Sequence, residues 1–131
     1  MINAEQIMLE PDVVVGIVQN AEGKIAMIRR NCPPNYGMWA LPAGERWEWE
    51  DPKVAVEREI YEETGIVVQG TTFLEKQGKI WYYKAQELLQ HETIEAATAW
   101  EISGFGWVDS DNPLVWLTYP ENKKVLDKYI L

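Results

Sequence analysis

The chain has 131 residues, 47% of them hydrophobic and seven of them tryptophan, so it can bury a core and is not expected to be disordered. Its formal net charge of −9 disfavours stable binding to nucleic acid or to an anionic membrane, because such binding depends on Lys and Arg meeting phosphates. A small anionic substrate stays compatible with this charge if cations bridge the like charges. Cys32 is the only cysteine, which excludes an intramolecular disulfide and a C-x-x-C metal site.

The beginning of the chain predicts neither secretion nor membrane insertion. Residues 1–10 are not basic and no long apolar segment follows them, so we expect no secretory signal, no bilayer-spanning segment and a cytoplasmic location. No internal repeat or linker interrupts the chain, and we expect residues 1–131 to form one domain. Monomer and homodimer are both compatible with the sequence.

The first third of the chain predicts a hairpin, a loop and a short strand. Residues 13–20 and 24–30 are β-branched runs separated by Ala-Glu-Gly, which is typical of a β-hairpin. Residues 31–37 are rich in Pro, Asn and Gly and indicate a loop. Residues 38–42 indicate a short strand that leads into a turn at Ala43 and Gly44.

From Asp51 onward the pattern changes to helix. Asp51 suits the N-cap, Pro52 suits the first helical position, and Gly65 suits the position just after the last turn. The sequence therefore predicts a helix over residues 52–63.

The second half of the chain predicts an antiparallel strand pair, a further strand and a closing helix. The strands are expected at about 66–75 and 79–88 with a turn at Gln77 and Gly78, and residues 89–103 fit either a helix or an irregular loop. Residues 105–109 indicate a short strand. The apolar spacing of Val125, Leu126, Tyr129 and Ile130 predicts a final helix. The expected class is α+β, a mixed sheet with a central helix and a C-terminal helix.

The predicted central helix gathers carboxylates on one side. Glu59, Glu62 and Glu63 are related by i, i+3 and i+4 and share one arc, while Val56 and Ile60 would face the sheet. These like charges repel one another, and the C-terminal end of a helix disfavours anions. A bound Mg²⁺ or Mn²⁺ would neutralise them, since hard cations prefer carboxylate oxygens. A solvated acidic helix face is the alternative.

The spacing of residues 44–66 resembles the signature of the Nudix hydrolase family, G-x5-E-x7-R-E-U-x-E-E-x-G-U, where U is a bulky aliphatic residue. Every specified position matches, in the order Gly44, Glu50, Arg58, Glu59, Ile60, Glu62, Glu63, Gly65 and Ile66. The resemblance implies a Nudix α/β/α sandwich with a mixed sheet. It also implies Mg²⁺-dependent hydrolysis of a nucleoside diphosphate linked to another moiety, with Mn²⁺ as a substitute ion.

The same resemblance implies roles for individual residues. Glu59, Glu62 and Glu63 match the family's metal ligands, and Ala43 matches the position that often adds a backbone carbonyl. Arg58 would hold the glutamates in orientation, and Glu50 would support the junction of loop and helix or assist a metal. The general base in this family is either a motif glutamate, where Glu59 and Glu62 are the catalytic candidates, or an acidic residue on a later loop, for which Glu101 is the first candidate and Glu92 and Glu95 are weaker ones.

The substrate is less sharply defined than the chemistry. Arg30 ends a strand beside the expected cleft and is a candidate for binding phosphate, while Trp39 and Trp47 are candidates for stacking on a base. Tyr82 and Tyr83 lie where dinucleoside polyphosphate hydrolases of this family often have a tyrosine, although the same residues suit strand packing. A (d)NTP or a similar small nucleotide is the first expectation. A dinucleoside polyphosphate hydrolase and a non-catalytic nucleotide-sensing module remain alternatives, and the motif leaves little room for a purely structural domain.

Overall fold

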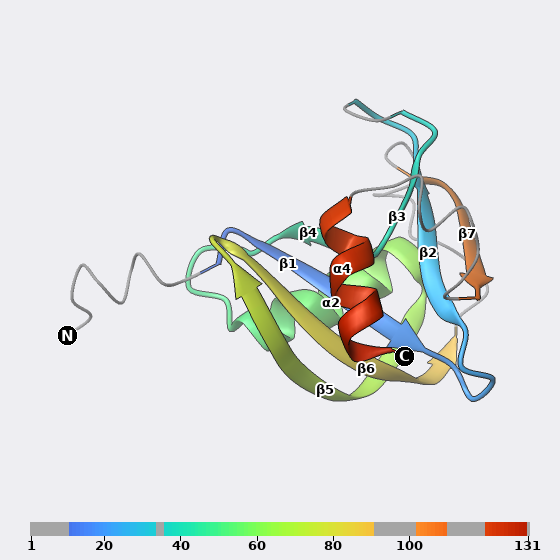
Figure 1. The fold of residues 1–131 in the computed structure, drawn as a ribbon. Helices are drawn as coiled ribbons and strands as arrows, with labels where there is room; N and C mark the ends of the chain where they lie inside the picture. The colour runs from blue at the N-terminus through green and yellow to red at the C-terminus, as the bar shows by residue number, and fades with distance from the viewer. Residues whose placement is uncertain (1–10, 34–35, 91–101, 110–119, 131) are drawn as a thin grey trace.

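The computed structural model describes residues 11–33, 36–90, 102–109 and 120–130. Within these residues the chain forms seven strands in one sheet and two helices (Figure 1). Their bounds are β1 Val13–Gln19, β2 Ile25–Arg30, β3 Trp39–Ala40, β4 Ala43–Glu45, α2 Pro52–Thr64, β5 Ile66–Gln77, β6 Ile80–Gln90, β7 Ile102–Val108 and α4 Pro120–Tyr129. The predicted α+β class is confirmed.

The sheet is mixed, as predicted. Its main path runs in the order β3-β2-β1-β6-β5, while β4 pairs with β1 and β7 pairs with β2. β1 and β6 run parallel, with Val13 opposite Ile80 and Gln19 opposite Gln86. The other pairings are antiparallel.

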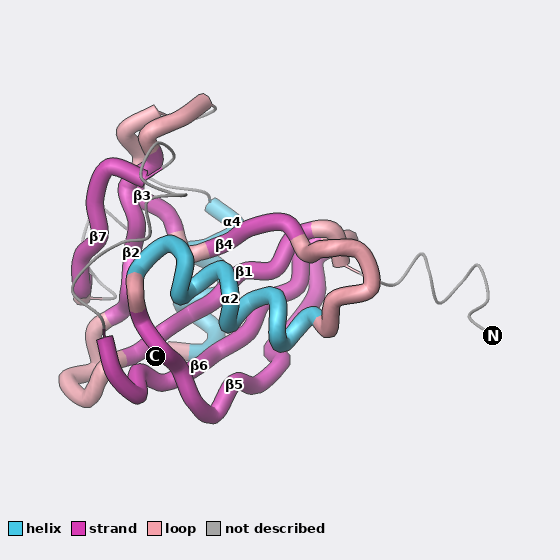
Figure 2. Tube along the Cα trace, turned by 180° about the vertical axis from the view of Figure 1, so that it is seen from behind, coloured by secondary structure: helices cyan, strands magenta, loops and turns pink. Residues whose placement is uncertain are grey.

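The two helices cover opposite faces of the sheet. Figure 1 shows α4 in front of β1 and β6, and Figure 2, the view from behind, shows α2 in front of the same strands. Alternate residues of β1 serve the two layers, because Val14 and Val18 pack in the cluster that includes α2, whereas Val15 and Ile17 pack in the cluster that includes α4. The arrangement is an α/β/α sandwich.

The central helix begins and ends where its sequence predicts. The Asp51 side chain accepts a hydrogen bond of 2.8 Å from the Lys53 amide, Pro52 occupies the first turn, and Gly65 adopts the left-handed conformation with φ 77°. On its inner side, Ile60 is fully buried and approaches β1 at Gly16, where a Cβ atom would stand 2.7 Å from the Ile60 Cδ1 atom. Glycine at this position therefore lets α2 lie close to the sheet.

Most predicted strand positions are confirmed, with four differences. β5 includes Gln77, so the turn predicted at Gln77 and Gly78 lies one residue later, at Gly78 and Lys79. β6 continues to Gln90 and β7 begins at Ile102, so both strands extend into the segment whose structure the sequence left open. The predicted turn at Ala43 and Gly44 is wrong, because residues 43–45 form β4 and pair antiparallel with residues 13–15 of β1. Long-range pairing outweighs the local turn preference of glycine at that point.

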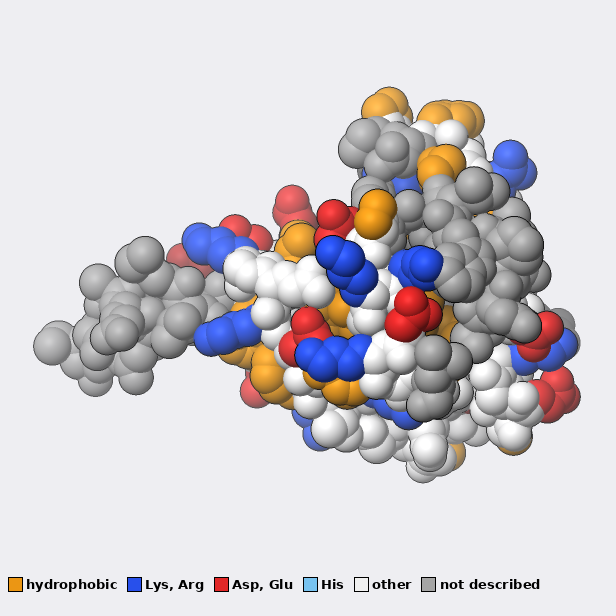
Figure 3. All heavy atoms as spheres, viewed as in Figure 1, with side chains coloured by type: hydrophobic (Ala, Val, Ile, Leu, Met, Phe, Trp, Pro, Cys, Tyr) orange, Lys and Arg blue, Asp and Glu red, His pale blue; other side chains and the backbone are white. Residues whose placement is uncertain are grey.

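On the side of α4, both signs of charge lie close together. The described Lys and Arg side chains are interspersed with Asp and Glu side chains over this face (Figure 3). Neither described helix combines the length and apolar character needed to cross a bilayer.

Candidate active site

Arg58 is the hub of a polar network beside α2. Its Nε and Nη2 atoms donate to Glu50 Oε2 and Oε1, both at 2.9 Å, in a bidentate pair. Its Nη1 atom donates to Glu59 Oε1 at 2.8 Å and to Glu62 Oε2 at 3.2 Å, and Nη2 also donates to the backbone oxygen of Glu45 at 3.1 Å. A guanidinium has five N–H groups, so these contacts use its whole donor capacity. This geometry supports the predicted orienting role of Arg58.

The loop before the helix is fixed to this network through Glu50. Its side chain is only 9% exposed, and the hydrogen bonds from Arg58 hold the pKa of the carboxyl below its usual range. The same pairing raises the pKa of Arg58. The Trp47 amide donates to Glu50 Oε1 at 3.0 Å, and the Arg46 side chain donates to the Glu50 backbone oxygen at 2.8 Å. The carboxylate therefore stays ionised and joins loop to helix.

Two further glutamates lie against β4. Glu63 is 5% exposed, and its Oε1 atom accepts a hydrogen bond of 2.8 Å from the Ala43 amide. A Cβ atom at Gly44 would overlap the carboxylate of Glu59, so only glycine leaves room for that side chain. The last turns of α2 are thus joined to the strand that carries the motif glycine.

These groups border a cleft of about 650 Å³. Its wall combines carboxylates from α2 with basic side chains from β2, the 46–47 loop and α2 itself. The lining residues are Arg30, Cys32, Ala43, Gly44, Glu45, Arg46, Trp47, Arg58, Glu59, Glu62, Glu63 and Ile102. Four glutamates and three arginines therefore line one space.

The donor set of the cleft suits a hard divalent cation, which needs oxygen ligands. Among the described residues, however, no three His, Cys, Asp or Glu side chains stand close enough to hold a metal ion as they are placed. Glu59 and Glu62 turn toward Arg58, and Glu63 turns toward the Ala43 amide. A cation would therefore require these side chains to rotate so that the second oxygen of each carboxylate meets it, while the first oxygen keeps its donor.

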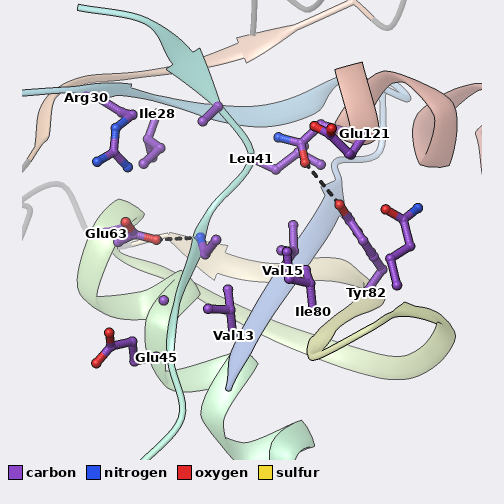
Figure 4. A pocket seen from close by; sticks show the side chains of 15 residues that line it. Val13, Val15, Ile28, Arg30, Leu41, Glu45, Glu63, Ile80, Tyr82 and Glu121 are labelled. Atoms are coloured by element: carbon purple, nitrogen blue, oxygen red, sulfur yellow. Dashed lines mark hydrogen bonds between the residues drawn. The ribbon is translucent and has the colours of Figure 1, made fainter. Parts of the chain in front are cut away.

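A second cavity of about 530 Å³ adjoins the cleft, and Figure 4 shows the side chains that line this cavity. The two share Arg30, Ala43, Gly44, Glu45 and Glu63 in their walls. The second cavity is mainly apolar, and its remaining lining comprises Val13, Val15, Ile28, Ala40, Leu41, Gln77, Ile80, Tyr82, Glu121 and Asn122. A polar, acid-lined space thus opens beside an apolar one.

Tyr82 is a wall residue of this second cavity and not an exposed platform. The residue is 1% exposed, and its hydroxyl lies 3.4 Å from Asn122 Oδ1 on α4 (Figure 4). Burial raises the pKa of Tyr82 to about 12. Tyr83, on the opposite face of the strand, is 5% exposed and packs in the cluster under α2.

The structure brings most predicted site residues together. Seven of them line the acid-lined cleft, and Glu50 joins them through Arg58; the seven are Arg30, Ala43, Trp47, Arg58, Glu59, Glu62 and Glu63. Trp39 lines neither cavity and packs against the cluster under α4. Glu92, Glu95 and Glu101 lie outside the described residues, so Glu101 as a base stays a prediction.

The sequence did not indicate those residues of the second cavity that lie far from the motif along the chain. Gln77 ends β5, and Asn122 lies in the first turn of α4, so neither is near the motif in sequence. Sequence reasoning also missed Arg46 and Glu45, which lie in the loop and strand between Gly44 and Glu50. Their place within the motif was the one signal that pointed to them.

Comparison with known proteins assigns the class of the fold and site described above. The family model described as "NUDIX domain" matches residues 9–129, and the chain belongs to the Nudix family. Among solved structures, a MutT protein from Methanosarcina mazei Go1 has a TM-score of 0.62 at 24% identity, covering 92% of this chain and 96% of that one. A NUDIX hydrolase from Nitrosomonas europaea has a TM-score of 0.70 at 16% identity, covering 92% and 88%. At these identities the structures establish the fold alone.

Two curated relatives have a higher sequence identity to this chain than these solved structures have. An 8-oxo-(d)GTP phosphatase from Mycolicibacterium smegmatis is 31% identical over 115 residues, which are 82% of this chain and 34% of that protein. The 8-oxo-dGDP phosphatase NUDT18 from Danio rerio is 35% identical over 71 residues, 53% of this chain and 22% of that protein. The chain thus spans about a third or less of the length of these relatives. Nudix proteins generally use a divalent metal ion, in keeping with the carboxylates of the cleft.

Proposed function

We propose that this chain is a Mg²⁺-dependent Nudix hydrolase that cleaves a pyrophosphate bond in a nucleoside diphosphate derivative. The first candidates are (d)NTPs and similar small nucleotides. The observation that carries the proposal is the junction of the two cavities at β4: the acid-lined cleft of about 650 Å³ suits phosphates with their cations, and the apolar cavity of about 530 Å³ suits a nucleoside. The proposal treats residues 1–131 as one cytoplasmic domain without nucleic-acid or membrane partners.

In this proposal, Glu59, Glu62 and Glu63 hold the divalent ion, with Glu50 and the Ala43 carbonyl in support. The chemistry such an ion supplies is neutralisation of phosphate charge and polarisation of the phosphorus under attack. Arg30 lies in both cavity walls, so its guanidinium would contact the phosphates where they pass from one space to the other. Arg58 keeps the glutamates oriented through its five donors, which limits the reorganisation required during the reaction.

Hydrolysis requires a carboxylate to accept a proton from the attacking water while the bridging P–O bond breaks. Glu62 is the most exposed of the Arg58-bound carboxylates, with 32% of its side chain accessible against 14% for Glu59. It can therefore reach solvent in the cleft, and it is the motif's candidate for this base. Glu101 is the candidate outside the motif.

The names of the curated relatives extend the list of substrates to test. Both act on 8-oxoguanine nucleotides by name, so 8-oxo-dGTP and 8-oxo-dGDP belong beside the ordinary nucleotides. A dinucleoside polyphosphate hydrolase is the alternative enzyme. The burial of Tyr82 and Tyr83 weakens it, because neither ring is free to stack on a second nucleoside.

The test is turnover of a nucleotide panel with Mg²⁺ or Mn²⁺, with phosphate and pyrophosphate measured separately. The panel includes (d)NTPs, both 8-oxo nucleotides, ADP-ribose and a dinucleoside tetraphosphate. Glu62→Gln and Glu63→Gln should lower kcat by at least about 10²-fold, the loss typical when charge stabilisation at a reacting group is removed. Glu57→Gln is the matched control, since Glu57 lies on the same helix outside the cleft.

Three results would each argue against the proposal. If no member of the panel is hydrolysed while a nucleotide still binds, the chain is a sensing module. Preference for the dinucleoside tetraphosphate would select the alternative enzyme. Near-normal turnover by Glu62→Gln and Glu63→Gln would remove these residues from the metal site.

A further inference from the structure

We infer that Trp47 is a positioning residue, which covers the guanidinium of Arg58 and thereby keeps the metal-binding glutamates in place. The Arg58 Cζ atom lies 3.8 Å from the centroid of the Trp47 ring. Trp47 is nevertheless 61% exposed, so core packing does not account for the position of this large apolar side chain. The inference rests on the proposed function, because it concerns the residues assigned to the metal.

The backbone around Trp47 sets the indole in this place. The Trp47 amide donates to Glu50 Oε1 at 3.0 Å, and the Trp47 carbonyl accepts from the Glu50 amide at 3.0 Å. Glu50 Oε1 also accepts from Arg58 Nη2 at 2.9 Å. Glu50 Oε1 therefore accepts from both the Trp47 amide and Arg58, while the Trp47 ring packs on the same Arg58 guanidinium.

Arg46 fixes the same loop from the other side. Its amide donates to the Asp12 oxygen at 3.0 Å, its Nε to the Pro11 oxygen at 3.0 Å, and its Nη1 to the Glu50 oxygen at 2.8 Å. The loop is thus anchored to the chain just before β1 and closed on itself at Glu50, next to the N-cap of α2. Trp47 does not need a ligand to reach the guanidinium, because the protein alone places it there.

The Trp47 indole shields one face of the Arg58 guanidinium, where the group has no N–H donor. All five N–H donors lie in the guanidinium plane and already have partners, so water can approach the group only across its faces. The ring of Trp47 occupies one face, and the Arg58 side chain is only 14% exposed. Excluding water there strengthens the ion pairs with Glu59 and Glu62 and adds a cation–π attraction.

The rival role for Trp47 is stacking on the base of the substrate, since the indole lines the cleft and is largely accessible. The two roles predict different kinetics. A residue that orients the glutamates changes metal affinity and kcat, whereas a residue that only stacks on the base changes KM. The two roles also predict different results in the free protein. Only under the positioning role does replacing Trp47 change the environment of the Arg58 side chain before any ligand is added.

The experiment compares Trp47→Phe, Trp47→Leu and Trp47→Ala with the wild type, with Trp49→Ala as control. Trp49 is a neighbouring exposed tryptophan, and it lines neither cavity. The first readout is the hydrogen-exchange rate of the Arg58 Nε–H group by ¹⁵N NMR in the free protein. The second is Mn²⁺ affinity without nucleotide, and the third is the separate effect on kcat and KM.

We expect Trp47→Leu and Trp47→Ala to speed Nε–H exchange and weaken Mn²⁺ binding by about two- to fivefold, the range of an exposed cation–π contact. Trp47→Phe should restore most of both, and Trp49→Ala should change neither. Unchanged exchange and Mn²⁺ affinity in the Leu variant, or a change confined to KM, would overturn the inference. If the wild type hydrolyses no nucleotide, the proposed function fails, while the exchange measurement still decides the role of Trp47 toward Arg58.

Discussion

Gly44→Ala is the substitution whose effect the structure defines most sharply. A Cβ atom there would lie 2.5 Å from Glu59 Oε1 and closer still to the rest of that carboxylate. An ordinary contact needs about 3.4 Å, so the carboxylate must retreat by at least about 1 Å. Gly44 is not among the glycines with positive φ, so alanine meets no backbone penalty and the whole effect is steric.

A retreat of this size reaches the Arg58 network, because Glu59 Oε1 accepts from Arg58 Nη1 at 2.8 Å. Misplacing a catalytic group by about 1 Å can cost about 10²-fold, and we expect kcat/KM to fall by about that factor. The free energy of unfolding should fall by only about 1–3 kcal/mol, since the obstructing atoms end a flexible side chain.

The assay pairs steady-state hydrolysis of the best substrate with urea unfolding and Mn²⁺ titration. Gly104→Ala is the matched control, because a Cβ atom there meets its nearest neighbour, Arg29 Cβ, at an ordinary 3.6 Å. If Gly44→Ala keeps kcat/KM and Mn²⁺ affinity within about threefold of the wild type, the Glu59 carboxylate does not have to stay where the structure places it.

Three further predictions concern stability. Tyr82 has a pKa of about 12 in the folded state and about 10 in the unfolded state. Its contribution to the free energy of unfolding is therefore complete below pH 10 and falls as the pH rises toward 12. Urea unfolding at pH 8 and pH 11 should show an extra loss of about 1.4 kcal/mol at the higher pH that Tyr82→Phe lacks. Asp51→Ala removes the cap on the Lys53 amide and should cost about 1 kcal/mol, with Asp51→Asn close to the wild type; equal stability of all three proteins would contradict this. Arg58→Gln should cost about 3 kcal/mol by leaving Glu50 unpaired, and adding Glu50→Gln should recover part of that loss; a strictly additive double mutant would show that the pair is not coupled.

The local features of the fold were predictable because they follow from neighbouring residues. Asp51, Pro52 and Gly65 mark the ends of α2, and the burial of Val56 and Ile60 follows from helical spacing. The motif supplied the family and the set of glutamates. These features depend on contacts within a few residues or on a fixed spacing.

The remaining features depend on contacts between distant segments. The pairing of β1 with β6 joins residues more than 60 positions apart, and no periodicity within either strand selects that partner. Asn122 reaches the second cavity only because α4 packs over Tyr82. The place of Trp47 over Arg58 likewise follows from loop geometry and not from composition.

The three residues of β4 line both the acid-lined cleft and the apolar cavity, to which the proposed function gives different roles. This arrangement has an evolutionary consequence. The far wall of the apolar space, formed by Gln77, Ile80 and Asn122, is not part of the lining of the acid-lined cleft, so it can change in shape or polarity while the reacting centre stays intact. Under the proposed function, a lineage could therefore exchange one nucleobase for another by substitutions at that wall alone. Changes within β4 itself would disturb recognition and turnover together, so selection should hold this short strand far more tightly than its length suggests.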